Sequence, residues 1–87
     1  MAYEVNWSAQ AAKHYRRLDK DGKTRVTAVV DRLPANPRPL GAEHVVSMPG
    51  VLRVRNGDYR VLYSVDEDKQ QVLIEDVRHR SKAYGGH

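Results

Sequence analysis

A change of hydrophobic period near Val51 limits the folds open to this chain more than any other feature. Before it, apolar residues recur at helical spacing, and after it apolar and polar residues alternate as in strands. "VLRVR", "NG" and "DYRVLYSV" (residues 51–65) predict a β-hairpin, because Asn-Gly suits the positive φ angles of a type I′ turn. "DEDKQ" (66–70) predicts a second turn, and "QVLIEDVRH" (71–79) predicts the last strand. The second half therefore predicts a three-stranded antiparallel meander.

The first half predicts a short strand followed by a helix. Residues 3–7 alternate loosely, as a short strand does. Ser8 is typical of an N-cap and opens a segment with apolar residues at helical spacing. These residues are Ala11, Ala12, Tyr15 and Leu18. "DKDG" (19–22) predicts the break that ends this helix, with Gly22 in the turn.

A second helix is predicted after that break. Its apolar residues keep the i, i+3, i+4, i+7 pattern, and they are Val26, Val29, Val30 and Leu33. Pro34 ends the helix, and "PANPRPLG" (34–41) predicts a connecting loop. The expected fold is α+β in the order β-α-α-β-β-β, a small single domain over residues 1–87. In this fold a helical hairpin packs on one face of an antiparallel sheet.

The composition narrows the class of protein. With 40% hydrophobic and 30% charged residues, the chain is typical of a globular domain rather than a disordered one. The absence of cysteine excludes disulfides and any cysteine-based metal site or nucleophile. Residues 1–4 lack the plan of a signal peptide and no apolar run approaches membrane-spanning length, so we expect a cytoplasmic protein without a membrane partner. The net charge of +4 fits nucleic acid or an acidic partner, or simply solubility.

The predicted hairpin register separates two kinds of sheet face. A two-residue Asn56-Gly57 turn sets Arg53 opposite Arg60, and like charges in that position destabilise a sheet. Such a conflict is typical of a functional site, and guanidinium groups bind phosphate through paired hydrogen bonds. The alternative is that Glu75 neutralises the pair. The apolar face carries Leu52, Val54, Tyr59, Val61, Tyr63, Val65, Val72 and Ile74, and the other face carries Arg53, Arg55, Arg60, Ser64, Glu75 and His79 with Leu62, Leu73 and Val77.

The C-terminal stretch "VRHRSKAY" (77–84) adds cations, an imidazole and a phenol to the arginine face. Arginines stabilise charge on a phosphorane, and an imidazole or phenol can transfer protons. The stretch therefore predicts the remainder of a phosphodiester-cleaving site, and a solubilising tail is the alternative. The histidines at 14, 44, 79 and 87 have no metal-ligand spacing, so neither a metal nor another cofactor is expected. His14 is expected to face solvent.

The segment "MPGVLRVRNGDYRVLYSVDEDKQQVLIEDVRHRSKAY" (48–84) resembles the C-terminal half of RelE-type toxins of the RelE/ParE superfamily. The matching features are the arginine strand, "GDYRVLY" (57–63) and "HRSKAY" (79–84), with a looser likeness through Trp7 and the paired helices. The resemblance implies the toxin of a type II toxin–antitoxin pair. It implies a metal-independent ribonuclease that enters the A site of the 70S ribosome and cuts mRNA there, by attack of the ribose 2′-OH on the adjacent phosphate.

The resemblance also implies roles for single residues. Arg60 matches the arginine that stabilises the transition state, and Arg80 matches one that contacts the phosphate and leaving group. Tyr84 matches a tyrosine that orients the substrate or acts as base, and His79 falls where relatives carry histidine or lysine. Tyr84 and His79 are therefore joint candidates for proton transfer. The residues expected to bind RNA phosphates are Arg53, Arg55, Arg78 and Lys82.

A cognate antitoxin, RelB-like or of another type II class, is the partner implied by this resemblance. Operator DNA would be bound only through the toxin–antitoxin complex. Three apolar residues predicted on the arginine face, Leu62, Leu73 and Val77, are the expected antitoxin contacts. Two other functions stay open: a ParE-like toxin that inhibits DNA gyrase, and a non-catalytic module whose basic face holds nucleic acid or an acidic protein. The combination of arginines with proton-transfer candidates favours the ribonuclease.

Overall fold

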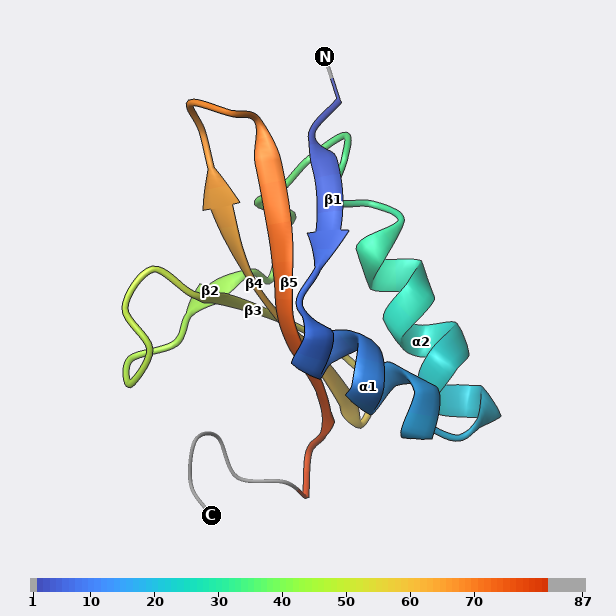
Figure 1. Ribbon diagram of the computed structural model, residues 1–87. Coiled ribbons are helices and arrows are strands. Elements are labelled where there is room, and N and C mark those ends of the chain that lie inside the picture. Colours follow the sequence, from blue (N-terminus) through green and yellow to red (C-terminus); the bar gives the residue numbers. More distant parts are fainter. Residues whose placement is uncertain (1, 82–87) are drawn as a thin grey trace.

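Two helices cover one face of a five-stranded sheet in the computed structural model, which describes residues 2–81 (Figure 1). The strands lie in the order β1-β5-β4-β3-β2. The elements are β1 (Glu4–Trp7), α1 (Ala9–Arg17), α2 (Lys20–Val30), β2 (Glu43–His44), β3 (Leu52–Asn56), β4 (Tyr59–Asp66) and β5 (Gln71–His79). This arrangement confirms the predicted α+β fold with a helical hairpin on one face of the sheet.

Two features of the sheet differ from the prediction. β1 pairs with β5 in parallel, so the sheet is mixed rather than wholly antiparallel. No hairpin links these two strands, and the helices and the meander between them leave their relative direction free. The two-residue strand β2 was not predicted; it pairs with the start of β3, where Glu43 lies opposite Arg53 and His44 opposite Leu52. It follows the predicted loop 34–41, in a stretch for which the sequence pattern indicated no element.

The helix starts are set by side chains that accept backbone hydrogen bonds. Ser8 is the N-cap of α1, as predicted, and its Oγ accepts from the Ala11 N–H at 3.0 Å. Asp19 is the N-cap of α2, and its Oδ1 accepts from the Gly22 N–H at 2.7 Å. The prediction that Gly22 lies in the interhelical turn is therefore wrong. Gly22 is buried inside α2, where a Cβ would lie 2.7 Å from Cε1 of the Tyr59 ring.

The main core lies between the helices and the sheet, and the predicted apolar pattern supplies it. Its largest fully buried side chains include Tyr63, Leu33, Ile74 and Val26. Tyr63 donates its hydroxyl to the Pro37 carbonyl at 2.7 Å, and burial raises the pKa of this phenol to about 12. The side chain is therefore a neutral core group that also secures the segment after α2.

A smaller apolar cluster covers part of the other sheet face. Leu62 of β4 is 1% exposed and packs under Val45 and Val51, with Met48 beside them. The segment between β2 and β3 forms this cover, and it lies on the side of the sheet away from the helices (Figure 1). Only part of the outer face is therefore open to solvent. Within residues 2–81, no helix has the length and apolar character needed to cross a membrane.

Candidate functional site

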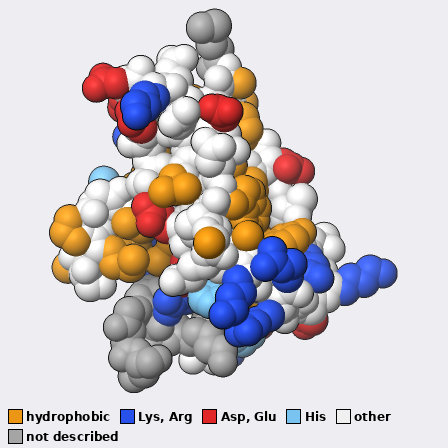
Figure 2. Space-filling view, in the orientation of Figure 1, with side chains coloured by type: hydrophobic (Ala, Val, Ile, Leu, Met, Phe, Trp, Pro, Cys, Tyr) orange, Lys and Arg blue, Asp and Glu red, His pale blue; other side chains and the backbone are white. Residues whose placement is uncertain are grey.

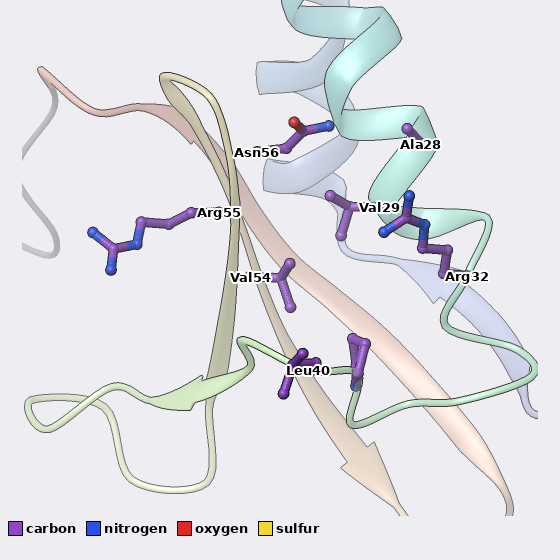
Figure 3. A pocket seen from close by; sticks show the side chains of 8 residues that line it. Ala28, Val29, Arg32, Leu40, Val54, Arg55 and Asn56 are labelled. Atoms are coloured by element: carbon purple, nitrogen blue, oxygen red, sulfur yellow. The ribbon is translucent and has the colours of Figure 1, made fainter.

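Three arginines lie side by side on the three central strands, next to the turn between β3 and β4. Arg60 of β4 lies directly opposite Arg55 of β3 on one side and opposite Arg78 of β5 on the other. We call Arg55, Arg60 and Arg78 the arginine row. Figure 3 shows Arg55 pointing away from α2, whereas Val54 and Asn56 on the same strand point toward it. The row therefore lies on the face of the sheet opposite the helices.

The hairpin register differs from the predicted one by two residues. Asn56 pairs with Tyr59, so the two turn residues are Gly57 and Asp58, and Gly57 takes the positive φ of 62°. The residue opposite Arg60 is consequently Arg55, and the predicted pairing of Arg60 with Arg53 is wrong. Because the difference is an even number of residues, every side chain of the hairpin keeps its predicted face.

A β-bulge in β5 reverses the predicted faces at the end of that strand. Leu62 pairs with Asp76 and Tyr63 with Ile74, so Glu75 is an extra residue without an opposite partner. After the bulge Arg78 lies on the same face as Arg60. Strict alternation along β5 had placed Arg78 on the opposite face. One extra residue thus completes the arginine row.

The same bulge turns His79 toward the helices. His79 lies opposite Tyr59, and their rings meet edge to face with centroids 5.2 Å apart. Its Nδ1 accepts a hydrogen bond from the Ser81 N–H at 3.1 Å. The prediction that His79 shares the face of Arg60 is therefore wrong. The Tyr59 hydroxyl donates to Asp19, and this bond, together with burial, raises the pKa of Tyr59.

Arg80 lies beside the arginine row through the hairpin turn. β5 ends at His79, and the Arg80 N–H donates to the Asp58 carbonyl at 2.7 Å. The Arg80 guanidinium lies 3.4 Å from the Asp58 carboxylate, and Arg60 donates to the Asp58 carbonyl at 3.4 Å. Asp58 of the hairpin turn therefore contacts both Arg60 and Arg80.

Glu43 of β2 holds the two arginines of β3. Arg53 Nη2 donates to its Oε1 at 2.7 Å, and Arg55 Nη2 lies 3.6 Å from the same oxygen. The hydrogen bond from Arg53 lowers the pKa of the Glu43 carboxyl, and the charges of Arg53 and Arg55 lower it further. Glu43 therefore offsets part of the positive charge of Arg53 and Arg55 at this edge of the sheet.

The three apolar residues predicted on this face have different environments. Leu62 is covered by the smaller cluster, and Val77 is 1% exposed within the main core, opposite Val61. The bulge explains Val77, and the cover between β2 and β3 explains Leu62. The expectation that both are exposed is wrong, whereas Leu73 is 38% exposed. Lys82 and Tyr84 lie outside the described residues.

Sequence reasoning missed a charged network next to the row. Asp76 is 3% exposed, and within residues 2–81 it is the only buried charged side chain. His14, which was expected to face solvent, brings its Nδ1 to 2.6 Å from Asp76 Oδ1, and Arg78 Nε donates to Asp76 Oδ2. The signal was a pair of acidic residues, Glu75 and Asp76, inside an apolar strand.

Basic side chains also gather on the helix side of the molecule. Figure 2 shows lysine and arginine side chains grouped where α1 and the start of α2 lie in Figure 1. The exposed ones in this part are Lys13, Arg16, Arg17 and Lys20. A shallow groove lies further along α2, with Val29, Leu40 and Val54 among its lining residues (Figure 3). No three potential metal-ligating side chains come together in the part of the chain that the structure describes.

Comparison with known proteins identifies the family. Residues 5–84 match the family described as ParE toxin of type II toxin-antitoxin system, parDE. Toxin RelE of Mycobacterium tuberculosis (strain ATCC 25618 / H37Rv) is 35% identical over 83 residues, which cover 94% of this chain and 86% of the relative. This chain belongs to the RelE/ParE superfamily of type II toxins. The resemblance predicted from "GDYRVLY" and "HRSKAY" is confirmed, with a RelE-type relative.

Solved RelE structures share the superfamily fold with this chain. The archaeal RelE–RelB complex from Pyrococcus horikoshii matches with a TM-score of 0.78 and 28% identity, over 95% of this chain and 100% of that one. The RelBE2 toxin–antitoxin complex of M. tuberculosis matches with a TM-score of 0.69 and 25% identity, over 94% and 95% of the two chains. The isolated E. coli RelE toxin matches in fold, with a TM-score of 0.79 and 20% identity over 95% and 89%.

Proposed function

We propose that this type II toxin is an endoribonuclease that cuts mRNA in the A site of the ribosome. The observation that supports it most strongly is the arginine row. Arg55, Arg60 and Arg78 are set opposite one another on three adjacent strands, and such like-charge neighbours cost stability. Glu43 and Asp76 offset part of this cost at Arg55 and Arg78, and an anion bound at Arg60 would offset more of it. A phosphodiester supplies that anion, and guanidinium groups match its geometry.

The proposed reaction needs only the RNA and the side chains of the protein. The ribose 2′-oxygen forms a bond to the adjacent phosphorus while the bond to the 5′-oxygen breaks, which leaves a 2′,3′-cyclic phosphate and a free 5′-OH. Arg60 stabilises the charge that grows on the non-bridging oxygens, and the neighbouring arginines hold the phosphate. Arg80 contacts the leaving 5′-oxygen, which gains a proton as the 2′-hydroxyl loses one.

Tyr84 is the proposed group for substrate orientation or for uptake of the 2′-OH proton. The assignment follows from the resemblance of "HRSKAY" to the closing segment of RelE-type toxins. His79 is no longer a candidate for this role, because its ring lies on the helix side against Tyr59 and its Nδ1 is hydrogen-bonded. Tyr84→Phe keeps the ring and removes the hydroxyl, so a large loss of cleavage would support a role for the oxygen and a wild-type rate would contradict it.

We further propose an antitoxin as the stable partner of this chain. Related RelE toxins have been solved in complex with RelB from P. horikoshii and as the RelBE2 complex of M. tuberculosis. Acidic residues of an antitoxin would meet the arginine row, and Leu73 offers an exposed apolar contact on the same face. Leu62 and Val77 are buried and are not proposed as contacts. Operator DNA would be bound through the complex.

Mapping the ends of a cleaved message tests the proposed activity. Purified protein is incubated with ribosomes programmed with a defined mRNA, and with the same mRNA alone. We expect cuts at the A-site codon that require the ribosome, with a cyclic phosphate on the upstream fragment. The family match to ParE makes gyrase inhibition the second candidate. Inhibition of DNA supercoiling by gyrase, with intact mRNA on ribosomes, would overturn the proposal in favour of that activity.

A further inference from the structure

Asp76 of β5 is a charge buried beside the arginine row. A buried carboxylate is strongly unfavourable unless its oxygens are paired, and here both oxygens are. Oδ2 accepts from Arg78 Nε at 2.5 Å and from Gln10 Nε2 at 3.1 Å. Oδ1 accepts from the Val77 N–H at 2.9 Å and lies 2.6 Å from His14 Nδ1. Such a network, with several partners from two elements, is costly to form and fixes the geometry of its members.

α1 contributes to this network from the edge of the sheet. Gln10 and His14 are one helical turn apart, so both side chains project from α1 toward Asp76. The start of the helix is attached at the bulge: the Ser8 N–H donates to the Ile74 carbonyl at 2.9 Å, and Ser8 Oγ donates to the Glu75 carbonyl at 3.0 Å. The N-cap of α1 is therefore hydrogen-bonded to the bulge of β5, and α1 packs against β5 from this point on (Figure 1).

The bulge and Asp76 together fix the position of Arg78. The bulge puts Arg78 opposite Arg60, and Asp76 then binds its guanidinium on the Nε side. The Arg78 side chain is 18% exposed, whereas that of Arg55 at the other end of the row is 54% exposed. Arg78 is thus held in one place by a buried carboxylate, while Arg55 extends to solvent. A pre-organised cation loses less entropy when the transition state forms.

We propose that Asp76 is a positioning residue for Arg78, and that α1 supports it through Gln10 and His14. This inference rests on the proposed ribonuclease, in which Arg78 holds the phosphate. Asp76 does not touch the RNA. It acts by fixing the guanidinium at the place where the phosphate oxygens lie, and a displacement of about 1 Å at such a site costs about 100-fold in rate.

A double-mutant cycle separates positioning from a general structural role. Single-turnover cleavage of ribosome-bound mRNA is measured for the wild type, Asp76→Asn, Arg78→Ala and the double variant, at saturating and subsaturating protein. We expect Asp76→Asn to lower the maximal rate about 10- to 100-fold with little change in the half-saturating concentration. In the Arg78→Ala background the same substitution should change the rate less than about 2-fold, because the effect passes through Arg78. Equal losses in both backgrounds, or a wild-type rate for Asp76→Asn, would overturn the inference.

A milder variant keeps the experiment decisive if Asp76→Asn folds poorly. His14→Ala leaves the carboxylate and its bond to Arg78 in place and removes one support, so we expect a smaller loss that also disappears without Arg78. Asp21→Asn is the matched control, since it breaks an exposed carboxylate–arginine pair with Arg25 and should leave the rate unchanged. A loss with His14→Ala that persists in the Arg78→Ala background would count against the inference.

A spectroscopic readout distinguishes failure of this inference from failure of the proposed function. The Nε–H resonance of Arg78 should be shifted and protected from exchange in the wild type, and should lose both properties in Asp76→Asn. If the wild type shows this signal but cuts no mRNA, the proposed ribonuclease fails and positioning for cleavage fails with it. If the wild type cuts mRNA and the signal is unchanged in Asp76→Asn, only the positioning inference is overturned.

Discussion

The two faces of the sheet use the same strands for opposite purposes. Toward the helices, Val61, Tyr63 and Ile74 are buried in a continuous apolar core. On the outer face, the alternate positions of the same strands carry the arginine row, and a short segment between β2 and β3 covers only Leu62 and its neighbours. The first face shows the usual burial of apolar side chains against helices, while the second sets like charges opposite one another.

This difference indicates that the arginine row lowers the stability of the fold. A sheet face without a ligand has no reason to align three guanidinium groups, because each is repelled by the next. The burial of the apolar face outweighs this repulsion, and Asp76 and Glu43 each offset part of the charge at one end of the row. We therefore expect substitutions on the helix-facing side to affect folding and substitutions in the row to affect activity.

The largest expected effect is on the core face. Ile74→Ala removes a fully buried side chain and should lower the free energy of unfolding by about 2–5 kcal/mol, measured by urea denaturation. Leu73→Ala, at the neighbouring position with its side chain on the outer face, is the matched control and should cost less than about 1 kcal/mol. Similar losses at both positions would contradict the division between the faces.

Arg60→Ala should show the reverse behaviour. Loss of one group that stabilises the transition state lowers the rate of mRNA cleavage by about two to three decades, or about 2.7–4 kcal/mol. Arg60 lies outside the core and opposite two like charges, so we expect the free energy of unfolding not to fall and to rise by about 0.2–1 kcal/mol. Arg16→Ala, on the exposed side of α1, removes the same charge and is the matched control, which should cleave mRNA at the wild-type rate. If Arg60→Ala cleaves mRNA at the wild-type rate, the assignment of the outer face as the catalytic site is wrong.

Gly22→Ala tests the contact between helix and sheet on the core face. A Cβ at this position would meet the Tyr59 ring, which is buried and bound to Asp19 by its hydroxyl. Overpacking of this kind costs about 1–3 kcal/mol, and the better helix propensity of alanine returns about 0.5–1 kcal/mol. We expect a net loss near 1 kcal/mol in thermal or urea unfolding. A more stable variant would mean that Tyr59 moves aside without cost.

The smallest expected effect is a gain of stability on the arginine face. Arg55→Gln removes one like-charge contact with Arg60 and should raise the free energy of unfolding by about 0.2–1 kcal/mol at low salt. The gain should shrink as salt is added, since ions screen the repulsion. Urea unfolding at low and high salt provides the measurement. A loss of stability at low salt would mean that the contact with Glu43 outweighs the repulsion.

Local patterns were sufficient for the two helices and for every strand except β2. The Ser8 cap, the helix-facing set and the outward direction of Arg55 and Arg60 follow from residue type and spacing, because caps and alternation depend on near neighbours. Gly22 was assigned to a turn because local sequence carries no sign of the Tyr59 ring that packs on it. His14 was assigned to solvent for the same reason, since its partner Asp76 is distant in sequence.

The sequence by itself determined the α+β class, the helical hairpin, the meander and the basic character of the outer face. The tertiary structure decided which arginines meet, which side His79 takes, and whether Val77 is exposed. The pairing of Arg55 with Arg60 follows from the hairpin register. The positions of Arg78, His79 and Val77 follow from the bulge at Glu75, because one unpaired residue reverses all later side chains of β5, and contacts with the N-cap Ser8 and with strand β4 hold it in place. Those contacts join segments far apart in the chain, so the hydrophobic pattern of a single strand cannot predict them.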